Sequence, residues 1–467
     1  MPRNIPRIVL SGLSGGAGKT MLSLGLARCL ADGGLKVKPF KKGPDYIDAV
    51  WLGLAAREKA VNLDQFFMQA ETLRSLFWQT AAGFDFAVVE GNRGLFDGLD
   101  EEGTTSTADL ARLLGLPVVL SLDCTKMTRT AAAVVKGVAG FETGLNLAGV
   151  VLNRTAGERH RSVLVKSIER HTDVPVLGAL PKIKPDPIPE RHMGLISDRE
   201  YSQAEEVLEK LAGVIADNCD VAAIRAAAGN AGGEARDIAP LWPAHVKAAG
   251  ARIGYVRDAA LWFYYEENIE ALRRAGAETV ELSLLSGDPW PEIHGLYLGG
   301  GFPETLAERL SENEAARNRV KSMAEAGMPI YAECGGLMFL GGSLKYGERE
   351  YPMSGVFDVT TELCERPQGL GYVEAEVVRD NPFHPAGTVI KGHEFHYSCC
   401  LPENAPPPHE LCLKLNRGSG MGHATDGMLK GNAFAAYTHI HALGCPWWAG
   451  RFVAAALNYK QVSERVG

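Results

Sequence analysis

The glycine-rich segment Gly12-Leu-Ser-Gly-Gly-Ala-Gly-Lys-Thr20 constrains the fold of this 467-residue chain more than any other stretch. The apolar run Arg7–Ser11 precedes it and the amphipathic run Met21–Ala31 follows it, so a strand, a glycine loop and a helix are expected in succession. Such a loop turns successive backbone N–H groups toward one point in front of a helix N-terminus. The segment therefore predicts a phosphate-binding loop in a domain with a parallel sheet.

The chemistry of this loop predicts a role for each of its members. Lys19 is expected to reach the β- and γ-phosphate oxygens of ATP, and the Thr20 hydroxyl is expected to bind Mg²⁺. Backbone groups that surround the phosphates are expected from Gly12, Gly15, Gly16, Ala17 and Gly18. Leu13 stands where the strict pattern has glycine. The alternative is a flexible loop with a chance Gly-Lys-Thr.

Acidic residues follow at the expected edge of the same sheet. The run Phe84–Gly91 is a predicted strand with Glu90 at its end, and parallel sheets bind ligands at the carboxyl ends of their strands. Glu90 is expected to hold the Mg²⁺ of a nucleotide together with Asp45 and Asp48. The alternative for Asp45 and Asp48 is a turn and a helix cap.

The rest of the N-terminal half alternates between strand and helix patterns. Strands are expected at 117–122, 147–153 and 174–180, with helices at 106–114 and 129–140. Alternation of this kind builds a doubly wound parallel sheet. Periodicity is poor from 218 to 250, so the expected division is a P-loop domain at 1–217, a linker at 218–250 and a second domain at 251–467.

Composition excludes several classes of protein. Hydrophobic residues make up 46% and charged residues 22%, and the net charge is −8, which argues against a nucleic-acid partner. No apolar run approaches the ~18 residues of a membrane span. The apolar stretch near the N-terminus is short for a secretion signal, so a cytoplasmic location is expected. None of the nine cysteines forms a Cys-x-x-Cys pair, which suggests free thiols.

A cysteine elbow is predicted in the C-terminal half. The apolar run Ile330–Ala332 indicates a buried strand, and a helix is expected from Leu337. Cys334 therefore sits on a sharp strand-to-helix turn, where a helix N-terminus is expected to lower the thiol pKa and favour a nucleophilic thiolate. The alternative is a small buried cysteine before a flexible Gly-Gly turn.

Two further segments offer partners for this nucleophile. Backbone amides of Gly300 and Gly301, with that of Gly335, are expected to form an oxyanion hole, although a tight turn entering a helix is the alternative. The run Ala435–Ala442 is predicted as one strand, on which period 2 places His439 and His441 on one face. One would act as base and the other as its neighbour, and a metal pair is the alternative.

The phosphate loop and the cysteine elbow together resemble the cobyrinic acid a,c-diamide synthases. These amidoligases join a dethiobiotin-synthetase-like ATP domain to a class I glutamine amidotransferase domain, and the resemblance covers nearly the whole chain. Further matching motifs are Gly43-Pro-Asp-Tyr-Ile-Asp48, Asn62-Leu-Asp64, Gly94-Leu-Phe-Asp-Gly98, Ser106-Thr-Ala-Asp109, Arg191-His-Met-Gly-Leu195, Tyr264-Tyr-Glu-Glu-Asn268, Tyr297-Leu-Gly-Gly-Gly-Phe-Pro-Glu304 and Gly392-His-Glu-Phe-His-Tyr-Ser398.

The resemblance implies an α/β fold in which a flavodoxin-like amidotransferase domain follows the P-loop sheet. It implies ATP- and Mg²⁺-dependent amidation of the a and c carboxylates of cobyrinic acid in cobalamin biosynthesis, through an acyl phosphate. Cys334 would cleave glutamine with His439 as base, while His441 stands where related domains often carry glutamate. Ammonia would pass between the domains, which implies a closed interface. The implied partners are glutamine and a multi-carboxylate tetrapyrrole, with the oligomeric state open.

Two departures bear on the substrate. Family members commonly read Glu-Gly-Val-Met-Gly where this chain has Glu90-Gly-Asn-Arg-Gly94, and proline where it has Ala49. Arg93 is expected to pair with a substrate carboxylate or a phosphate, and Tyr46 and Asp97 are the other candidate substrate residues. Relatives that amidate sirohaem, hydrogenobyrinic acid or nickel-sirohydrochlorin share the framework, so the macrocycle stays open.

An alternative of another class is an ATPase switch of the partition type. Such switches carry a lysine immediately before the Gly-Gly pair, and this chain has Ser14 there. The cysteine elbow in the C-terminal half also has no place in a switch.

Overall fold

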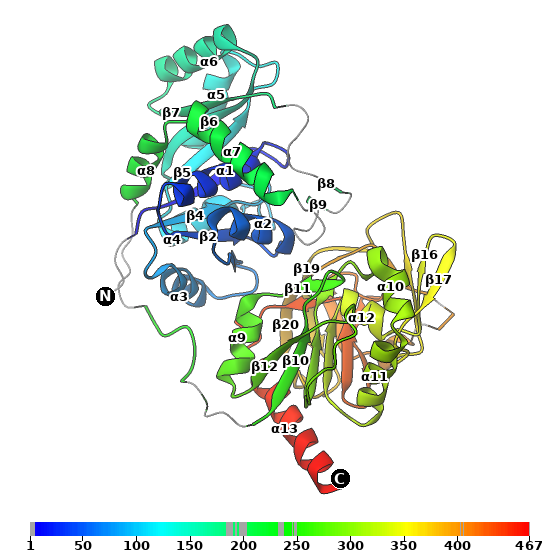
Figure 1. The fold of residues 1–467 in the computed structure, drawn as a ribbon. Helices are drawn as coiled ribbons and strands as arrows, with labels where there is room; N and C mark the ends of the chain where they lie inside the picture. Colours follow the sequence, from blue (N-terminus) through cyan, green and yellow to red (C-terminus); the bar gives the residue numbers. More distant parts are fainter. Residues whose placement is uncertain are drawn as a thin grey trace. The chain divides into compact units, whose positions relative to one another are not determined.

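The computed structural model describes residues 5–183, 190–191, 194–195, 203–231, 238–244, 246, 250–401, 403–404 and 406–466. The chain divides into two compact units, Met1–Leu241 and Trp242–Gly467, and each is an α/β unit around its own sheet (Figure 1). In the part of the chain that is described, every helix is too short or too polar to cross a membrane.

The sheet of the first unit has the strand order β3-β2-β4-β1-β5-β6-β7, and its neighbouring strands are parallel. Its strands are β1 (Arg7–Gly12), β2 (Val37–Lys42), β3 (Val61–Leu63), β4 (Phe86–Glu90), β5 (Val118–Asp123), β6 (Leu147–Thr155) and β7 (Val176–Pro181). This confirms the doubly wound parallel sheet predicted from the alternating pattern. The carboxyl ends of β1, β2 and β4 meet at one edge, where the predicted nucleotide residues lie.

Helices surround this sheet (Figure 1). They are α1 (Lys19–Asp32), α2 (Tyr46–Ala56), α3 (Ala70–Ala81), α4 (Thr107–Leu114), α5 (Thr130–Phe141), α6 (Glu158–His171), α7 (Ala204–Asn218) and α8 (Val221–Gly229). Helix α1 packs against α2 and α7. A Cβ atom at Gly25 would lie 2.8 Å from the carbonyl oxygen of Leu211, so glycine lets α1 and α7 approach closely. This packing fixes the helix that begins at the phosphate loop.

Helix α8 corrects the expected linker. The Asp220 side chain caps the helix by accepting the N–H of Ala223 at 2.8 Å, and the helix packs against β1, β6 and β7. Residues 221–229 therefore belong to the first unit. The sequence signal was present, because aspartate is a good N-cap and alanine is the best helix former.

The structure describes only part of the motif Arg191-His-Met-Gly-Leu195. The short strands β8 (Glu190–Arg191) and β9 (Gly194–Leu195) pair with each other, and the residues between them lie outside the described part of the chain.

The main sheet of the second unit has the order β12-β10-β13-β15-β25-β24, with β24 antiparallel at its edge. Its strands are β10 (Arg252–Val256), β12 (Glu278–Leu282), β13 (Gly295–Leu298), β15 (Ile330–Glu333), β24 (Met428–Lys430) and β25 (Ala433–Ala436). A separate antiparallel sheet, β23-β22-β19-β20-β26, consists of β19 (Gly369–Val377), β20 (Val389–His396), β22 (Leu413–Arg417), β23 (Thr425–Asp426) and β26 (His439–Ile440). The remaining strands are β11 (Leu261–Phe263), β14 (Gly300–Gly301), β16 (Ser343–Tyr346), β17 (Arg349–Pro352), β18 (Thr360–Leu363) and β21 (Ser398–Cys400).

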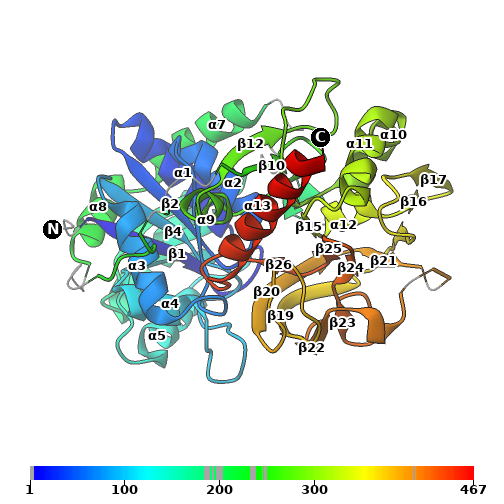
Figure 2. The same cartoon turned by 90° about the horizontal axis from the view of Figure 1, so that it is seen from below.

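Helices pack on both faces of the main sheet. The helices of the second unit are α9 (Glu266–Arg274), η1 (Pro303–Leu306), α10 (Ala307–Glu312), α11 (Glu314–Glu325), α12 (Gly335–Leu340), η2 (Pro408–Glu410) and α13 (Trp448–Val466). Helices α9 and α13 contact each other (Figure 2).

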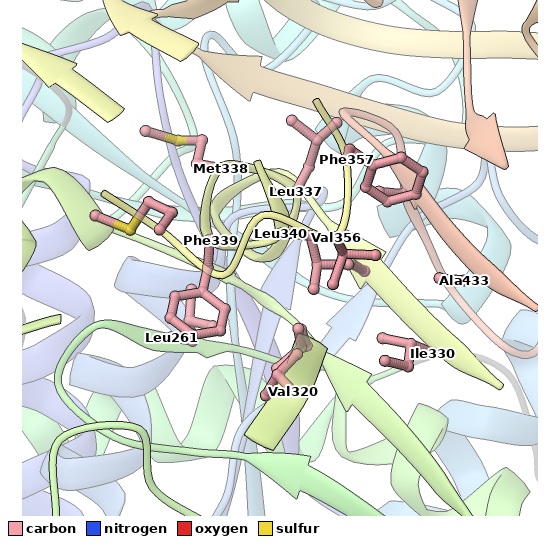
Figure 3. Packing of buried hydrophobic residues seen from close by; sticks show 14 of the residues in the cluster. Leu261, Val320, Ile330, Leu337, Met338, Phe339, Leu340, Val356, Phe357 and Ala433 are labelled. Carbon is pink, nitrogen blue, oxygen red and sulfur yellow. The ribbon is translucent and has the colours of Figure 1, made fainter. Parts of the chain in front are cut away.

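Side chains of β13 and β15 alternate between two buried clusters, because successive residues of a strand point to opposite faces. Leu296 and Ile330 belong to the cluster that includes α11 and α12, where Val320 and Phe339 pack near Ile330 (Figure 3). Tyr297 and Tyr331 belong to the cluster that includes α9 and α13. The strand that leads to Cys334 is therefore buried on both sides.

Candidate active site

The phosphate loop joins β1 to α1 in a conformation that requires glycine. A Cβ atom at Gly12 would lie 2.8 Å from the Cβ of Ala17. Gly18 has φ 82°, and a Cβ there would lie 2.0 Å from Nδ2 of Asn153. Asn153 and Ser121 both donate to the Ala17 carbonyl, at 3.2 and 2.9 Å. Side chains of β5 and β6 thus fix the position of Ala17 in the loop.

Lys19 and Thr20 occupy the first turn of α1. The ammonium group of Lys19 donates to the carbonyl oxygen of Ser14 at 2.9 Å, so the side chain folds back over the loop. Burial lowers the pKa of Lys19, and the nearby cation of Lys41 lowers it further. The Thr20 hydroxyl donates to Oε1 of Glu90 at 2.9 Å. Their roles toward phosphate and Mg²⁺ stay predictions.

Lys41 is a residue of this site that sequence reasoning missed. It is a direct register partner of Glu90, because β2 and β4 are parallel neighbours. Its Nζ lies 2.6 Å from Oδ2 of Asp48 and 3.0 Å from Oε1 of Glu90. Burial by itself would lower the pKa of Lys41, but the two carboxylates raise it above its usual value. The sequence feature that could have indicated Lys41 is its position near the end of a strand, just before the Gly43-Pro-Asp turn.

Glu90 is fully buried at the end of β4, where Thr20 and Lys41 contact its carboxylate. Its Oε2 atom has no hydrogen-bond partner among the described residues. Burial raises the pKa of Glu90, while Lys41 opposes this rise and Asp48 adds to it. A buried oxygen without a partner is unfavourable, and hydroxyl and carboxylate oxygens are the ligands that Mg²⁺ prefers. Mg²⁺ binding by Thr20, Asp48 and Glu90 stays a prediction, because no group of three or more His, Cys, Asp or Glu side chains among the described residues is arranged to hold a metal ion.

Asp45 has a structural role at the start of α2. Its Oδ1 atom accepts the N–H groups of Ile47 and Asp48, at 2.8 and 3.0 Å. Burial raises the pKa of Asp45 to about 7, with Asp48 adding to this shift and Lys41 opposing it. Asp45 therefore caps α2, as the alternative interpretation expected. A role for Asp45 in metal binding stays a prediction.

The candidate substrate residues Arg93 and Asp97 lie on a turn that contacts the phosphate loop, and Tyr46 lies at the start of α2. Tyr46 is the first residue of α2 and is buried, whereas Arg93 and Asp97 are exposed. The turn that carries Arg93 is tied to the phosphate loop, because the N–H of Leu95 donates to the Gly12 carbonyl at 2.8 Å. Asp97 accepts a backbone N–H within its own turn at 2.9 Å. Contact of the three residues with substrate stays a prediction.

In the second unit, Cys334 joins β15 to α12 with a left-handed backbone, φ 47° and ψ −100°. Such a conformation is strained for a residue with a side chain, and it is typical of functional turns. Burial raises the pKa of the Cys334 thiol and Glu304 adds to this, while the N–H of Gly335 lowers it. Burial therefore outweighs the expected lowering of the Cys334 pKa by the helix N-terminus. The thiol needs a base to lose its proton.

The predicted oxyanion glycines lie around this elbow. A Cβ atom at Gly300 would lie 2.4 Å from Cε1 of His439, and a Cβ at Gly335 would lie 3.0 Å from the backbone nitrogen of Gly301. Gly300 and Gly301 form strand β14, which pairs with β11. The turn thus lies against both the histidine and the first residue of α12, and its role as an oxyanion hole stays a prediction.

The single strand predicted over 435–442 is wrong. Strand β25 ends at Ala436, and His439 begins β26, which belongs to the other sheet. The buried carboxylate of Asp426 causes the break, because it accepts the N–H groups of Tyr437 and Thr438 at 3.1 and 2.9 Å. The period-2 argument for the two histidines therefore does not hold.

His439 and His441 face different acids. Nδ1 of His439 lies 3.6 Å from Oε2 of Glu333, and its ring stacks on His393 with a centroid distance of 4.8 Å. Nε2 of His441 lies 3.6 Å from Oε2 of Glu267. The use of His439 as a base and of His441 as its neighbour stays a prediction.

Comparison with known proteins assigns both units. Residues 8–195 match the family described as the CobQ/CobB/MinD/ParA nucleotide binding domain, and residues 252–447 match the CobB/CobQ-like glutamine amidotransferase domain. The phosphate loop thus lies in a nucleotide-binding domain and the Cys334 elbow in a glutamine amidotransferase domain. The chain is a ligase of the amidotransferase class that carries its own nucleotide-binding unit.

Similar full-length proteins share this arrangement. One from Magnetococcus marinus is 40% identical over 96% of this chain and 97% of its own length. Another from Listeria monocytogenes is 39% identical, covering 93% and 96%, and one from Archaeoglobus fulgidus is 36% identical, covering 98% and 99%. All three are named cobyrinate a,c-diamide synthase. The chain belongs to the cobyrinate a,c-diamide synthase family, which confirms the resemblance seen in its motifs.

Proposed function

We propose that the chain uses ATP and glutamine to amidate the a and c side-chain carboxylates of cobyrinic acid in cobalamin biosynthesis. The names of its relatives support this substrate. The observation that carries the reaction type is one chain with both a phosphate loop beside buried charged groups and a strained cysteine elbow beside a buried histidine. The first feature suits carboxylate activation, and the second suits the release of ammonia from an amide.

In the first unit, a substrate carboxylate oxygen attacks the γ-phosphorus of ATP, ADP leaves and an acyl phosphate forms. A carboxylate is a poor electrophile, so this step creates the leaving group that ammonia needs. Lys19 and the loop N–H groups hold the phosphates, and Lys41 offsets the charge of Glu90. Mg²⁺ held by Thr20, Asp48 and Glu90, with Asp45 as a further candidate ligand, would neutralise phosphate charge when bound.

In the second unit, Cys334 attacks the side-chain amide carbon of glutamine. His439 accepts the thiol proton and returns it to the leaving nitrogen, so ammonia departs and a thioester remains. Backbone N–H groups at Gly300, Gly301 and Gly335 stabilise the oxyanion. Water then hydrolyses the thioester to glutamate.

Ammonia is the product of the glutamine cleavage and the nucleophile of the final amidation step. It attacks the carbonyl carbon of the acyl phosphate, phosphate leaves, and the carboxylate has become an amide. Arg93 would pair with a neighbouring carboxylate of a macrocycle that carries several, and Tyr46 and Asp97 are the other candidate substrate residues.

The test uses the purified full-length protein with ATP, Mg²⁺ and either glutamine or ammonium chloride. Cobyrinic acid, hydrogenobyrinic acid, sirohydrochlorin, nickel-sirohydrochlorin and sirohaem are offered separately, and mass spectrometry counts losses of about 1 Da for each OH replaced by NH₂. We expect two such losses on cobyrinic acid. Amidation of a different macrocycle alone would overturn the substrate, and amidation of none would overturn the reaction.

The Cys334→Ala variant tests the division of labour in the same assay. It is expected to lose amidation with glutamine and to keep it with ammonium. A folded variant that lost both activities would contradict the assignment of Cys334 to ammonia release alone.

A further inference from the structure

We propose that Glu333, the residue before the nucleophile, is the positioning residue that orients His439 and stabilises its protonated form. The proposal rests on the glutaminase function proposed above. It assigns the third member of the cysteine–histidine site to the strand of the nucleophile and not to the residue two places after the histidine.

The carboxylate of Glu333 contacts three groups around the histidine. Its side chain is fully buried. Oε2 lies 3.6 Å from Nδ1 of His439 and accepts the hydroxyl of Tyr297 at 3.0 Å. Oε1 accepts the N–H of Ile440, the next residue after His439, at 3.1 Å. One carboxylate thus accepts a hydrogen bond from the backbone of the histidine segment and lies beside its ring.

Strand alternation explains why Glu333 points to this place. Ile330 and Ala332 pack in the cluster with α12, and Tyr331 packs in the opposite cluster with Tyr297. Glu333 follows the same alternation, so its side chain lies on the face of Tyr297. A buried carboxylate costs free energy unless it is hydrogen-bonded. Tyr297 and Ile440 supply these hydrogen bonds, so the carboxylate can keep its charge beside the imidazole of His439.

The contacts of the His439 ring agree with this assignment. Nδ1 faces Glu333, while a Cβ atom built at Gly300 would lie 2.4 Å from Cε1 and 3.3 Å from Nε2. A proton on Nδ1 held toward the carboxylate leaves Nε2 as the acceptor at the edge nearer the glycine turn. When the thiol proton moves to Nε2, the Glu333 charge stabilises the imidazolium and itself takes no proton.

His441 has other contacts. Its Nδ1 accepts the N–H of Leu443 at 3.2 Å, and its Nε2 lies 3.6 Å from Oε2 of Glu267. A histidine in the place of glutamate also provides no fixed negative charge. Glu333 provides that charge at the ring nitrogen where it is needed.

Other titratable groups pack around this cluster and must be considered in any pH measurement. Burial lowers the pKa of His393, which stacks on His439, well below its usual value, and His439 and His441 lower it further. The other titratable groups around the cluster include Cys334, Glu304, His441, Glu267, Tyr264, Tyr297, Tyr331, Asp426 and Cys445. Because Glu333→Gln leaves all of them in place, a shift in the variant reports the Glu333 charge.

The experiment compares the full-length protein with Glu333→Gln, which keeps the side-chain shape and an acceptor for Ile440. We expect glutaminase kcat/KM to fall about ten- to a hundredfold, with ammonium-dependent amidation unchanged. The rate of Cys334 alkylation by iodoacetamide is followed against pH by mass spectrometry of the Cys334 peptide. Its midpoint is expected to move up by about one pH unit, because the imidazolium partner of the thiolate is less stable.

Two variants keep the proposal falsifiable. Glu267→Gln removes the acid that faces His441 and should change kcat/KM by no more than about twofold. Tyr297→Phe frees Oε2 from a donor and should move the alkylation midpoint to lower pH, which tests Glu333 even if Glu333→Gln folds poorly. An unchanged midpoint in a folded Glu333→Gln variant, or the predicted shift in Glu267→Gln instead, would overturn the assignment. A wild-type protein without glutaminase activity would contradict the proposed function itself.

Discussion

The ammonium nitrogen of Lys41 lies 3.0 Å from Oε1 of Glu90, and both side chains are buried at the carboxyl edge of the first sheet. Asp48 contacts the same ammonium group at 2.6 Å. One internal cation therefore offsets two carboxylates at the place where a nucleotide-bound cation is expected. Removal of either partner from such a buried arrangement leaves an uncompensated charge.

Replacement of Lys41 by methionine tests this arrangement. It should lower the free energy of unfolding of the first unit by about 3 kcal/mol in a chelating buffer, because Asp48 and Glu90 lose their counter-charge. Mg²⁺ should restore part of this loss by binding the two carboxylates. Urea unfolding with and without Mg²⁺ measures both effects.

Lys38→Met is the matched control for this experiment. Lys38 is also buried on β2, but it donates to the Lys59 carbonyl at 2.7 Å and lies 3.8 Å from Glu58. The Lys38→Met variant should lose less unfolding free energy than Lys41→Met, and Mg²⁺ should not change that loss. Equal Mg²⁺ rescue of both variants would argue against a metal site at Glu90.

Lys19→Ala should stop amidation with either nitrogen source. The side chain lies over the phosphate loop, so its removal should lower the amidation rate by about a hundredfold or more. Glutamine hydrolysis at Cys334 should survive without ATP. The exposed Lys36 provides a control variant with normal activity. A Lys19→Ala protein that amidates at the wild-type rate would contradict the ATP assignment.

Gly300→Ala should remove glutamine-dependent activity through a steric effect. The new methyl group would lie 2.4 Å from Cε1 of His439, so the ring or the glycine turn must move. Catalysis depends on such geometry, and a fall in kcat of about a hundredfold is expected, with ammonium-dependent amidation retained. Gly287→Ala, at a position with open space, is the control. Equal activity of the two variants would place the histidine elsewhere during catalysis.

His384 should make the second unit less stable in mild acid. Burial lowers its pKa to about 3, with Arg451 adding to the shift, so the folded state holds the neutral ring. The unfolded chain takes up the proton near pH 6.5, and the contribution of His384 to stability is lost as pH falls below that value, by about 1.4 kcal/mol per pH unit.

The His384→Asn variant isolates this contribution. Asparagine keeps an acceptor for the indole N–H of Trp447, which donates to Nδ1 of His384 at 3.3 Å. The difference in unfolding free energy between wild type and variant should shrink between pH 7 and pH 5 in urea titrations. Parallel stability curves for the two proteins would contradict a neutral buried His384.

Local patterns predicted much of the fold, including the phosphate loop and the strand-to-helix turn at Cys334. The apolar run before Cys334 and the glycines after it define β15 and α12, and the phosphate loop lies between a strand and a helix as expected. These features depend on backbone preferences and burial, which short segments carry by themselves.

Features that depend on distant residues could not be predicted. The break between Ala436 and His439 depends on Asp426, whose carboxylate takes the N–H groups that a continuous strand would have offered to its neighbour. The contact between Lys41 and Glu90 depends on which strands become neighbours, and 49 residues separate the two. Pairing across such a distance is a property of the topology, not of local propensity.

The left-handed backbone at Cys334 has a consequence for the evolution of the protein. A residue with a side chain in that conformation costs on the order of 1–3 kcal/mol, whereas glycine adopts it freely. Glycine at position 334 would therefore favour stability, whereas glutamine cleavage needs cysteine there. A library of variants selected only for survival at high temperature should accumulate glycine at 334, and its most durable members would no longer use glutamine.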